Sequence, residues 1–278
     1  MSKIIDAIIK TREITADIFD KCLANLEGKS EYEISERIRY VVQSHKQIYS
    51  EGWYSPPPFG VAILLDQKPF DRLKYDSLRK SAFWPKDDIF FQKETVGMIF
   101  FSPVDRKTNM IGDIGFTLYI GDNAEIREHI KKSYLTILEI AKHAAIGMSF
   151  SDLCSFADNS IKDRFKMSRW ITKYSDPRGI NLGHTIPGSY ENINFGRSFE
   201  EIRQAITKGR IYIKETTDFK IPETCALTIE SRLEDLHKPH LPSTYFHFIV
   251  CFDNGKKSIL ENFSQIFETV GMSYMNSK

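Results

Sequence analysis

GMIFFSPV at residues 97–104 and MIGDIGFTLYIG at residues 110–121 are two short apolar runs, separated by the polar residues 105–109. Runs of this length, rich in Ile, Phe and Tyr and joined by a turn-rich segment, are typical of neighbouring antiparallel strands. The two runs therefore predict a β-hairpin, around which the rest of the chain is arranged.

Two helices and a strand are predicted on the N-terminal side of this hairpin. Isoleucines recur at helical spacing up to about residue 25. Ser30-Glu31-Tyr32-Glu33 matches a capping box, which starts a second helix that runs to about His45. Three prolines then break the chain before GVAILLD, which predicts a buried strand at residues 60–66.

Helices followed by strands are also predicted on the C-terminal side of the hairpin. Residues 123–146 predict a helix, and Ser149 or Ser151 could cap another helix to about Phe165. Beyond it the patterns predict a helix at 199–207, strands at 210–214, 225–231 and 246–252, and a turn at 253–255. Helices around a mostly antiparallel, hairpin-built sheet indicate an α+β fold, and two halves of similar content fit an internally duplicated domain.

Composition excludes several classes of protein. The 278 residues carry a net charge of +1 and are 41% hydrophobic, enough for a large core but without the positive field of a nucleic-acid or anionic-membrane binder. No apolar run approaches the roughly 20 residues that span a bilayer, and the N-terminus reads as an amphipathic helix and not as a signal peptide. The four isolated cysteines fit reduced thiols, so we expect a cytoplasmic protein.

Three short motifs in a fixed order resemble those of a known enzyme family. They are Gly112-Asp113-Ile114-Gly115-Phe116-Thr117, Gly183-His184-Thr185-Ile186-Pro187-Gly188 and Leu227-Thr228-Ile229-Glu230, followed by the tail YFHFIVCFDNG. Together they resemble the catalytic domain of the pita-bread metallopeptidases, namely aminopeptidase P, methionine aminopeptidase and creatinase. The resemblance covers about residues 30–260 of what we expect to be a single domain, residues 1–278. The extra N-terminal domain of aminopeptidase P and creatinase is expected to be absent.

The resemblance implies a curved, mostly antiparallel sheet covered by helices and a centre of two Asp, one His and two Glu. Such a centre binds two Mn, Fe, Co or Zn ions, whose bridging water becomes a nucleophile. Asp113 matches the second Asp, His184 the histidine and Glu230 the first Glu. Ser102 stands where the first Asp belongs, and Phe246 stands where the last Glu belongs. The implied metal centre is therefore incomplete.

The family's two catalytic histidines have no counterpart at the expected positions. One falls near Trp84, and the other falls at Glu191 or, after a local shift, at Tyr190. We therefore expect Trp84 and Tyr190 to line the pocket, with Glu230 and Glu191 as candidate catalytic groups. Strand alternation points His247 away from the pocket, whereas a slip of one residue would turn it inward as a substitute ligand.

Three functions remain open. In the first, Asp113, His184 and Glu230 hold one Mn, Fe or Zn ion, or no metal, in a repurposed enzyme that acts on a small peptide- or amino-acid-like substrate. In the second, the domain only binds a peptide or protein. In the third it is a conventional two-metal aminopeptidase. The expected partner is a small molecule or peptide, not nucleic acid or membrane, and the family's frequent dimers leave a homodimer open.

Overall fold

The predicted hairpin forms the middle of one half of a larger sheet. In this computed structural model, which describes residues 2–167 and 182–276, β2 (Val96–Phe101) pairs antiparallel with β3 (Ile114–Tyr119). On its other side, β2 pairs with β1 (Val61–Asp66). All three strands are almost wholly buried, as continuous apolar sequences require.

The second half contributes the remaining strands. They are β4 (Phe165–Met167), β5 (Cys225–Asp235), β6 (Thr244–Asp253) and β7 (Lys256–Leu260). Within the described residues, seven strands form one sheet in the order β1-β2-β3-β6-β5-β4, with β7 paired to β6. The two halves meet where Phe116 of β3 lies opposite Phe246 of β6.

The helices other than the last begin at residues whose side chains cap them. Ser30 and Ser198 each form a full capping box, with Glu33 and Glu201 respectively, while Asn123 and Ser149 accept hydrogen bonds from the first turns of their helices. The helices are α1 (Lys3–Cys22), α2 (Glu31–Ser44), α3 (Ala124–His143), α4 (Phe150–Ile161), α5 (Phe199–Lys208) and α6 (Ser264–Thr269).

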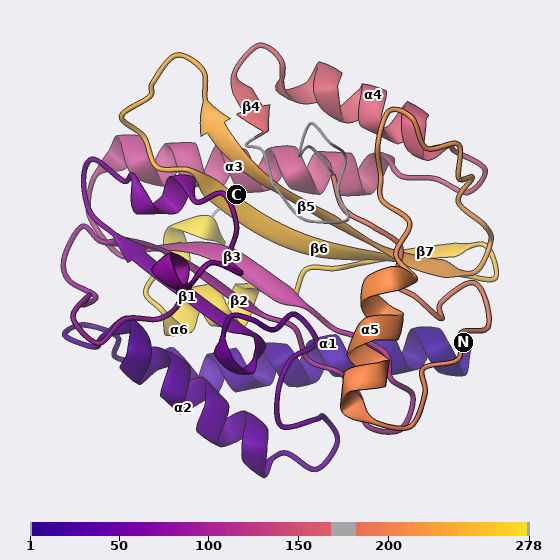
Figure 1. Cartoon of the computed structure of the whole chain (residues 1–278). Helices are drawn as coiled ribbons and strands as arrows, with labels where there is room; N and C mark the ends of the chain where they lie inside the picture. Colours follow the sequence, from indigo (N-terminus) through magenta and orange to yellow (C-terminus); the bar gives the residue numbers. More distant parts are fainter. Residues whose placement is uncertain (1, 168–181, 277–278) are drawn as a thin grey trace.

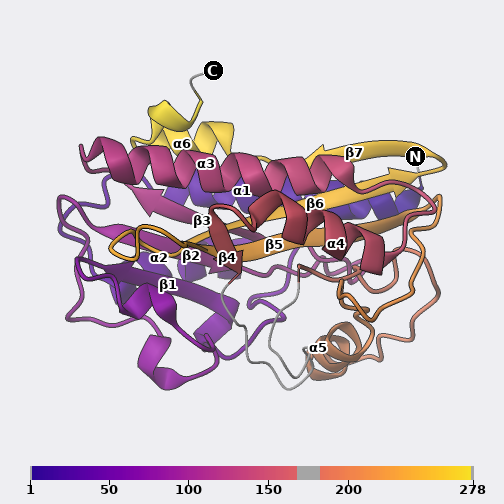
Figure 2. The same cartoon turned by 90° about the horizontal axis from the view of Figure 1, so that it is seen from above.

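The helices divide between the two faces of the sheet. Figure 2 shows α1, α3 and α6 on one face, which we call the back face, and α5 on the other, the front face. The α2 helix packs against β1 and α1 (Figure 1). In the region that the structure describes, no helix is both long and apolar enough to cross a membrane.

The order of elements shows an internal repeat. Two helices precede β1, β2 and β3, and two helices precede β4, β5 and β6. The sheet order is symmetric about the contact between β3 and β6. The expectation of an α+β domain with a duplicated, mostly antiparallel sheet is therefore confirmed.

Some local predictions were wrong. The predicted strand 210–214 forms only an isolated bridge between Tyr212 and His184, because this segment pairs with the loop around residue 184 and not with the sheet. The helix expected to run to Phe165 ends at Ile161, and Phe165 instead opens β4. The short α6 helix had no clear signal in the sequence.

Candidate functional site

The front face of the sheet carries a cluster of buried polar side chains. Asp113 directly precedes β3, His184 lies in the loop bridged to Tyr212, and Glu230 lies in β5. These three residues, distant in sequence, line one cavity of about 30 Å³, room for roughly two water molecules. The structure thus brings the three predicted ligand residues together. The other residues that line the cavity are Trp53, Tyr54, Leu78, Phe100 and Arg210.

The register of β6 places different residues at this site than the motif spacing indicated. Glu230 lies directly opposite His247 in the β5–β6 ladder, and directly opposed side chains share a face. Tyr245 and His247 therefore point to the front, with Glu230, and Phe246 points to the back. The strand therefore presents the imidazole of His247 and the phenol of Tyr245 on the face where the motif spacing had indicated Phe246. The inward orientation of His247, the less favoured alternative from the sequence, is the one that the structure has.

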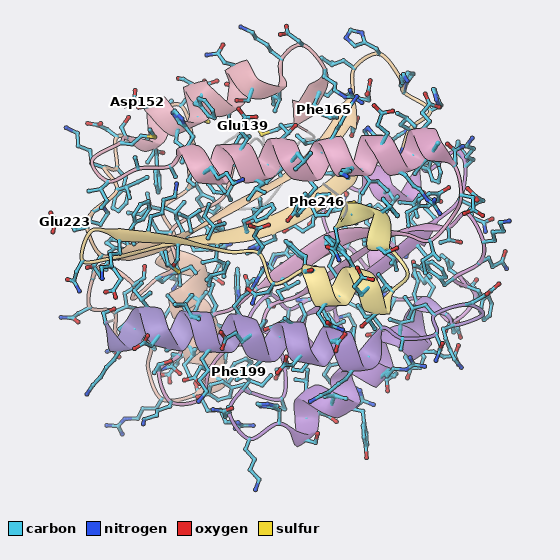
Figure 3. All side chains as sticks on the ribbon, turned by 180° about the vertical axis from the view of Figure 1, so that it is seen from behind. Glu139, Asp152, Phe165, Phe199, Glu223 and Phe246 are labelled. Carbon is cyan, nitrogen blue, oxygen red and sulfur yellow. The ribbon has the colours of Figure 1, made fainter. Side chains whose placement is uncertain are left out.

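Phe246 does not line the pocket. It is fully buried on the back face, with its ring 5.2 Å from that of Tyr134 in α3 and 6.2 Å from that of Phe263. Figure 3 shows it beneath α3 on the helix-covered side of the sheet. Its expected place at a lost ligand position was wrong, because a shift of one residue along a strand moves a side chain to the opposite face.

Glu230 is the centre of the cluster. The hydroxyl of Tyr245 donates a hydrogen bond of 2.5 Å to its Oε2 atom. Its Oε1 atom lies 3.6 Å from Nε2 of His184, and its Oε2 atom lies 4.0 Å from Nε2 of His247. Burial raises the pKa of the Glu230 carboxyl, against the opposing effects of the Tyr245 hydrogen bond and the positive charge of Arg210.

Tyr245 reaches Glu230 because the neighbouring strand has a glycine. A Cβ atom on Gly115 would lie 2.4 Å from Cε1 of Tyr245 and 2.9 Å from Cδ2 of Phe100. Only a residue without a side chain leaves room for both rings across β3. The glycine of the Gly-Asp-Ile-Gly motif thus allows the rings of Tyr245 and Phe100 to pack across β3.

The carboxylate of Asp113 accepts a hydrogen bond from Trp53, a residue that no sequence motif had indicated. The indole nitrogen of Trp53 lies 3.0 Å from Oδ1 and 3.1 Å from Oδ2 of the carboxylate. The N–H group is therefore shared between both oxygens. Burial raises the pKa of Asp113 well above its usual range, and the hydrogen bond from Trp53 opposes this shift.

A buried arginine supports the cluster from behind. Arg12 of α1 is fully buried, and its guanidinium donates to the backbone oxygens of Asp113, His247 and Glu261. A cation is thus fixed directly behind the backbone of two residues of the cluster. Burial lowers the pKa of Arg12 to about 9, although the charge of Asp113 favours its protonated form.

His184 is oriented by its own loop. Its Nδ1 atom lies 2.9 Å from the carbonyl oxygen of Thr185. Since a carbonyl only accepts, Nδ1 carries the proton and the neutral ring leaves the Nε2 lone pair facing Glu230. Burial lowers the pKa of His184 to about 3, and the nearby Arg210 adds to this effect. The loop approaches β5 through Gly183, at φ 145°, where a Cβ atom would lie 2.0 Å from the oxygen of Thr228.

Ser102 has a structural partner and does not line the cavity around Glu230. Its hydroxyl accepts a hydrogen bond of 3.0 Å from the backbone N–H of Tyr54. A Cβ atom at Gly52 would lie 2.5 Å from this hydroxyl, so the loop packs closely over it. Ser102 therefore anchors the loop that carries Trp53 and Tyr54, a role that a charged Asp would not fulfil without a counter-ion.

The remaining predicted site residues lie outside the cavity. Tyr190 packs edge-on against Phe219 at 5.1 Å, and burial raises its pKa to about 12. Glu191 is exposed. Trp84 is partly buried in a loop that Arg72 ties to the buried carboxylate of Glu31. None of the three lines the cavity around Glu230, so the structure does not place them as expected.

A two-metal centre of the kind that the resemblance implies makes a specific demand on its carboxylates. A bridging carboxylate must offer each of its oxygens to a cation, with the two cations about 3.5–4 Å apart. In Asp113 the Trp53 N–H group already takes the edge between the two oxygens. Among residues 2–167 and 182–276, no three His, Cys, Asp or Glu side chains are grouped so that they could hold a metal ion.

The residues missed from the sequence had weak signals. Trp53 lies just before three prolines, and Arg210 follows the glycine that ends α5, so neither belongs to a motif. Tyr245 precedes the residue that the spacing selected and was not indicated by any motif. His247 follows that residue, and its inward orientation was an alternative that the strand register decides.

Comparisons with known proteins bear on the fold. No protein-family model matches the sequence, and no curated protein matches it. Solved structures do match: X-Pro aminopeptidase from Thermotoga maritima MSB8 has a TM-score of 0.63 and 16% identity, over 94% of this chain and 61% of that protein. Prolidase from Pyrococcus furiosus has a TM-score of 0.58 and 18% identity, over 94% and 64%. Methionine aminopeptidase from Thermotoga maritima has a TM-score of 0.63 and 12% identity, over 94% and 97%.

At these identities the likeness shows the fold alone. The chain has the pita-bread fold that its motifs indicated, with an open antiparallel sheet and helices. It spans about three-fifths of the length of the X-Pro aminopeptidase and almost the whole of the methionine aminopeptidase.

Proposed function

We propose that this protein binds a small peptide- or amino-acid-like ligand at the front face and does not cleave it by two-metal hydrolysis. The observation that carries this proposal is the indole N–H group of Trp53, placed between both oxygens of Asp113. A proton donor in that position repels a cation and competes for lone pairs that a bridging carboxylate would offer to metal.

The charges around the cluster support the same function. Two buried carboxyl groups, Asp113 and Glu230, lie between Arg12 behind the sheet and Arg210 at the cavity wall. Each arginine opposes the burial effect on a carboxyl pKa, so the cluster has cationic partners from the chain itself. A dication would have to enter against both guanidinium groups, which makes its binding electrostatically unfavourable.

The surroundings of the cavity suit binding. Trp53, Tyr54 and Phe100 supply aromatic surface, and Arg210 supplies hydrogen-bond donors at the rim. Pockets with mainly apolar walls and a few convergent polar groups are typical of small-molecule sites. A bound ligand would contact the rings with its apolar part and the rim with its polar groups.

One observation favours a second function, an enzyme that relies on acid–base chemistry. Within the described part of the chain, neither ring nitrogen of His247 has a hydrogen-bond partner, although the ring is buried 4.0 Å from Glu230. Burial lowers the pKa of His247 well below its usual range and raises that of Glu230, a pairing that suits proton exchange. Glu230 lines the cavity, and His247 lies behind it, 4.0 Å from its Oε2 atom.

Metal analysis and peptide cleavage test the proposal together. The purified protein, incubated with Mn, Fe, Co or Zn salts, should retain no stoichiometric metal and should not cleave Xaa-Pro or Met-initiated peptides. Trp53→Phe is the informative variant, because it keeps an aromatic ring and frees the edge of Asp113. Any metal uptake should appear in this variant and not in the wild type.

Two results would decide against the main proposal. Two metal equivalents with turnover of an Xaa-Pro dipeptide would establish a conventional aminopeptidase. One equivalent that is lost in both Asp113→Ala and Glu230→Ala would establish a mononuclear enzyme. Turnover without metal that is lost in His247→Gln would support the acid–base alternative.

A further inference from the structure

A second, larger pocket opens beside the cavity on the front face. Its volume is about 280 Å³, and it lies between α5 and the loop of Trp53, Tyr54 and Ser55. Trp53, Tyr54 and Arg210 border both spaces. A ligand in the outer pocket would therefore touch the walls of the inner cluster.

The lining of this outer pocket is strongly basic. Arg79, Arg203, Lys208 and Arg210 contribute four cationic side chains, and Glu200 is the single acidic residue among those that line it. Glu200 forms an ion pair of 3.1 Å with Arg203. In a chain whose net charge is only +1, such a local excess of positive charge is not a property of the surface as a whole.

Two of the arginines are held close together by one backbone oxygen. The carbonyl of Ser55 accepts hydrogen bonds of 3.0 Å from Arg79 and 2.6 Å from Arg203. The guanidinium of Arg79 also lies 4.3 Å from the centre of the Tyr54 ring. Like charges fixed so near each other repel, and an anion between them would remove that repulsion.

Arg210 lies between the two spaces. Its guanidinium stacks 4.8 Å from the ring of Trp53 and 5.2 Å from that of Tyr212. Within the described residues its hydrogen bond is a 3.4 Å contact from Nε to the oxygen of Thr207. Stacking fixes the plane of the group, so the two terminal NH₂ groups are preorganised for a bidentate anion.

We propose that the outer pocket holds a ligand group with at least two negative charges, of the phosphate or dicarboxylate class. Four basic residues against one acidic residue exceed what a single carboxylate would neutralise. The inference rests on the proposed function only in placing the rest of the ligand over the Glu230 cluster. The anion site itself depends on the arginines alone.

Calorimetric titration of the full chain tests this site. Inorganic pyrophosphate and phosphate represent one source of charge, and malonate represents the dicarboxylate class. Acetate at matched ionic strength is the singly charged control. At least one multiply charged probe should bind and raise the Tm, whereas acetate should do neither.

Variants then locate the binding. Arg210→Gln and Arg79→Gln should each weaken binding about tenfold, which corresponds to ~1.4 kcal/mol. Lys132→Gln removes an exposed charge on α3, at the opposite face, and should leave binding unchanged. Because Arg79 is only half-buried, its variant provides the test if Arg210→Gln fails to fold.

The outcomes separate this inference from the proposed function. No binding of any multiply charged probe, or an equal loss in Lys132→Gln and Arg79→Gln, would overturn the anion site. Metal uptake with peptide turnover would overturn the proposed function and leave the anion site intact. Preference for pyrophosphate or for malonate assigns the class of the charged group.

Discussion

Glu230 and Ser231 are neighbours on β5, and their opposite partners on β6, His247 and Phe246, occupy the two faces of the same sheet. On the back face Phe246 packs among the rings of Tyr134 and Phe263 beneath the helices. On the front face Glu230 and His247 are also buried, but there burial raises the pKa of Glu230 and lowers that of His247, so it favours the neutral form of each. Burial stabilises the back face through apolar contact, whereas it imposes a cost on the front face.

The two faces of the sheet therefore contribute to stability in opposite ways. The apolar packing on the back face stabilises the fold. Arg12 connects this face to the site, because its guanidinium donates hydrogen bonds to backbone oxygens of Asp113 and His247. The front face holds polar groups in an unfavourable environment, which proteins retain at functional sites. Substitutions on the two faces should therefore change stability in opposite directions.

The largest expected effect is on the back face. Phe246→Ala removes a fully buried ring that contacts Tyr134 and Phe263, so we expect a loss of about 3–5 kcal/mol in the free energy of unfolding. Urea unfolding at neutral pH measures it. Phe246→Leu is the matched control and should lose clearly less. A loss below about 1 kcal/mol for the alanine variant would mean that the back face is not the stabilising one.

A smaller effect of opposite sign is expected on the front face. Glu230→Gln keeps an oxygen acceptor for the Tyr245 hydroxyl and removes a buried carboxyl. The pKa of Glu230 is raised on folding, so the folded wild type binds more protons than the unfolded chain above about pH 4.5 and loses stability as pH rises. The variant escapes this loss, and we expect it to be more stable by about 1 kcal/mol at pH 8.

The pH series is the check on that sign. The advantage of Glu230→Gln over the wild type should shrink as pH falls towards the ordinary pKa of the carboxyl, 4.5. Thermal unfolding at pH 5 and pH 8 gives the comparison, with Glu191→Gln as an exposed control. A variant that is less stable than the wild type at pH 8 would show that Glu230 is well compensated in its charged form.

The sequence predicted the fold well because the signals for it are local and repeated. The capping box at Ser30 and the apolar runs around residues 97–121 each specify an element without distant partners. The gathering of Asp113, His184 and Glu230 was also predictable, since short motifs in a fixed order were sufficient. The segment 210–214 shows the limit, because its partner is a loop and not a strand.

The composition of the site was less predictable, for a geometric reason. Spacing selected Phe246, but a single-residue difference in register exchanges the faces of a strand, and register depends on the pairing of Glu230 with His247. Trp53 and Arg210 reach the cluster from loops whose paths depend on tertiary contacts such as the hydrogen bond from Tyr54 N–H to Ser102. Side chains supplied by loops carry no periodic signal.

The smallest effect is expected at Glu191, which the spacing of the family's histidines had marked as a catalytic candidate. Its side chain is exposed and does not line either front-face pocket. Glu191→Gln should therefore change the free energy of unfolding by less than about 0.5 kcal/mol and should leave anion binding as in the wild type. Titration of this variant beside Arg210→Gln gives the measurement. A loss of binding as large as that of Arg210→Gln would mean that the loop after Tyr190 folds over the pocket when ligand is present, and would extend the front-face site to include it.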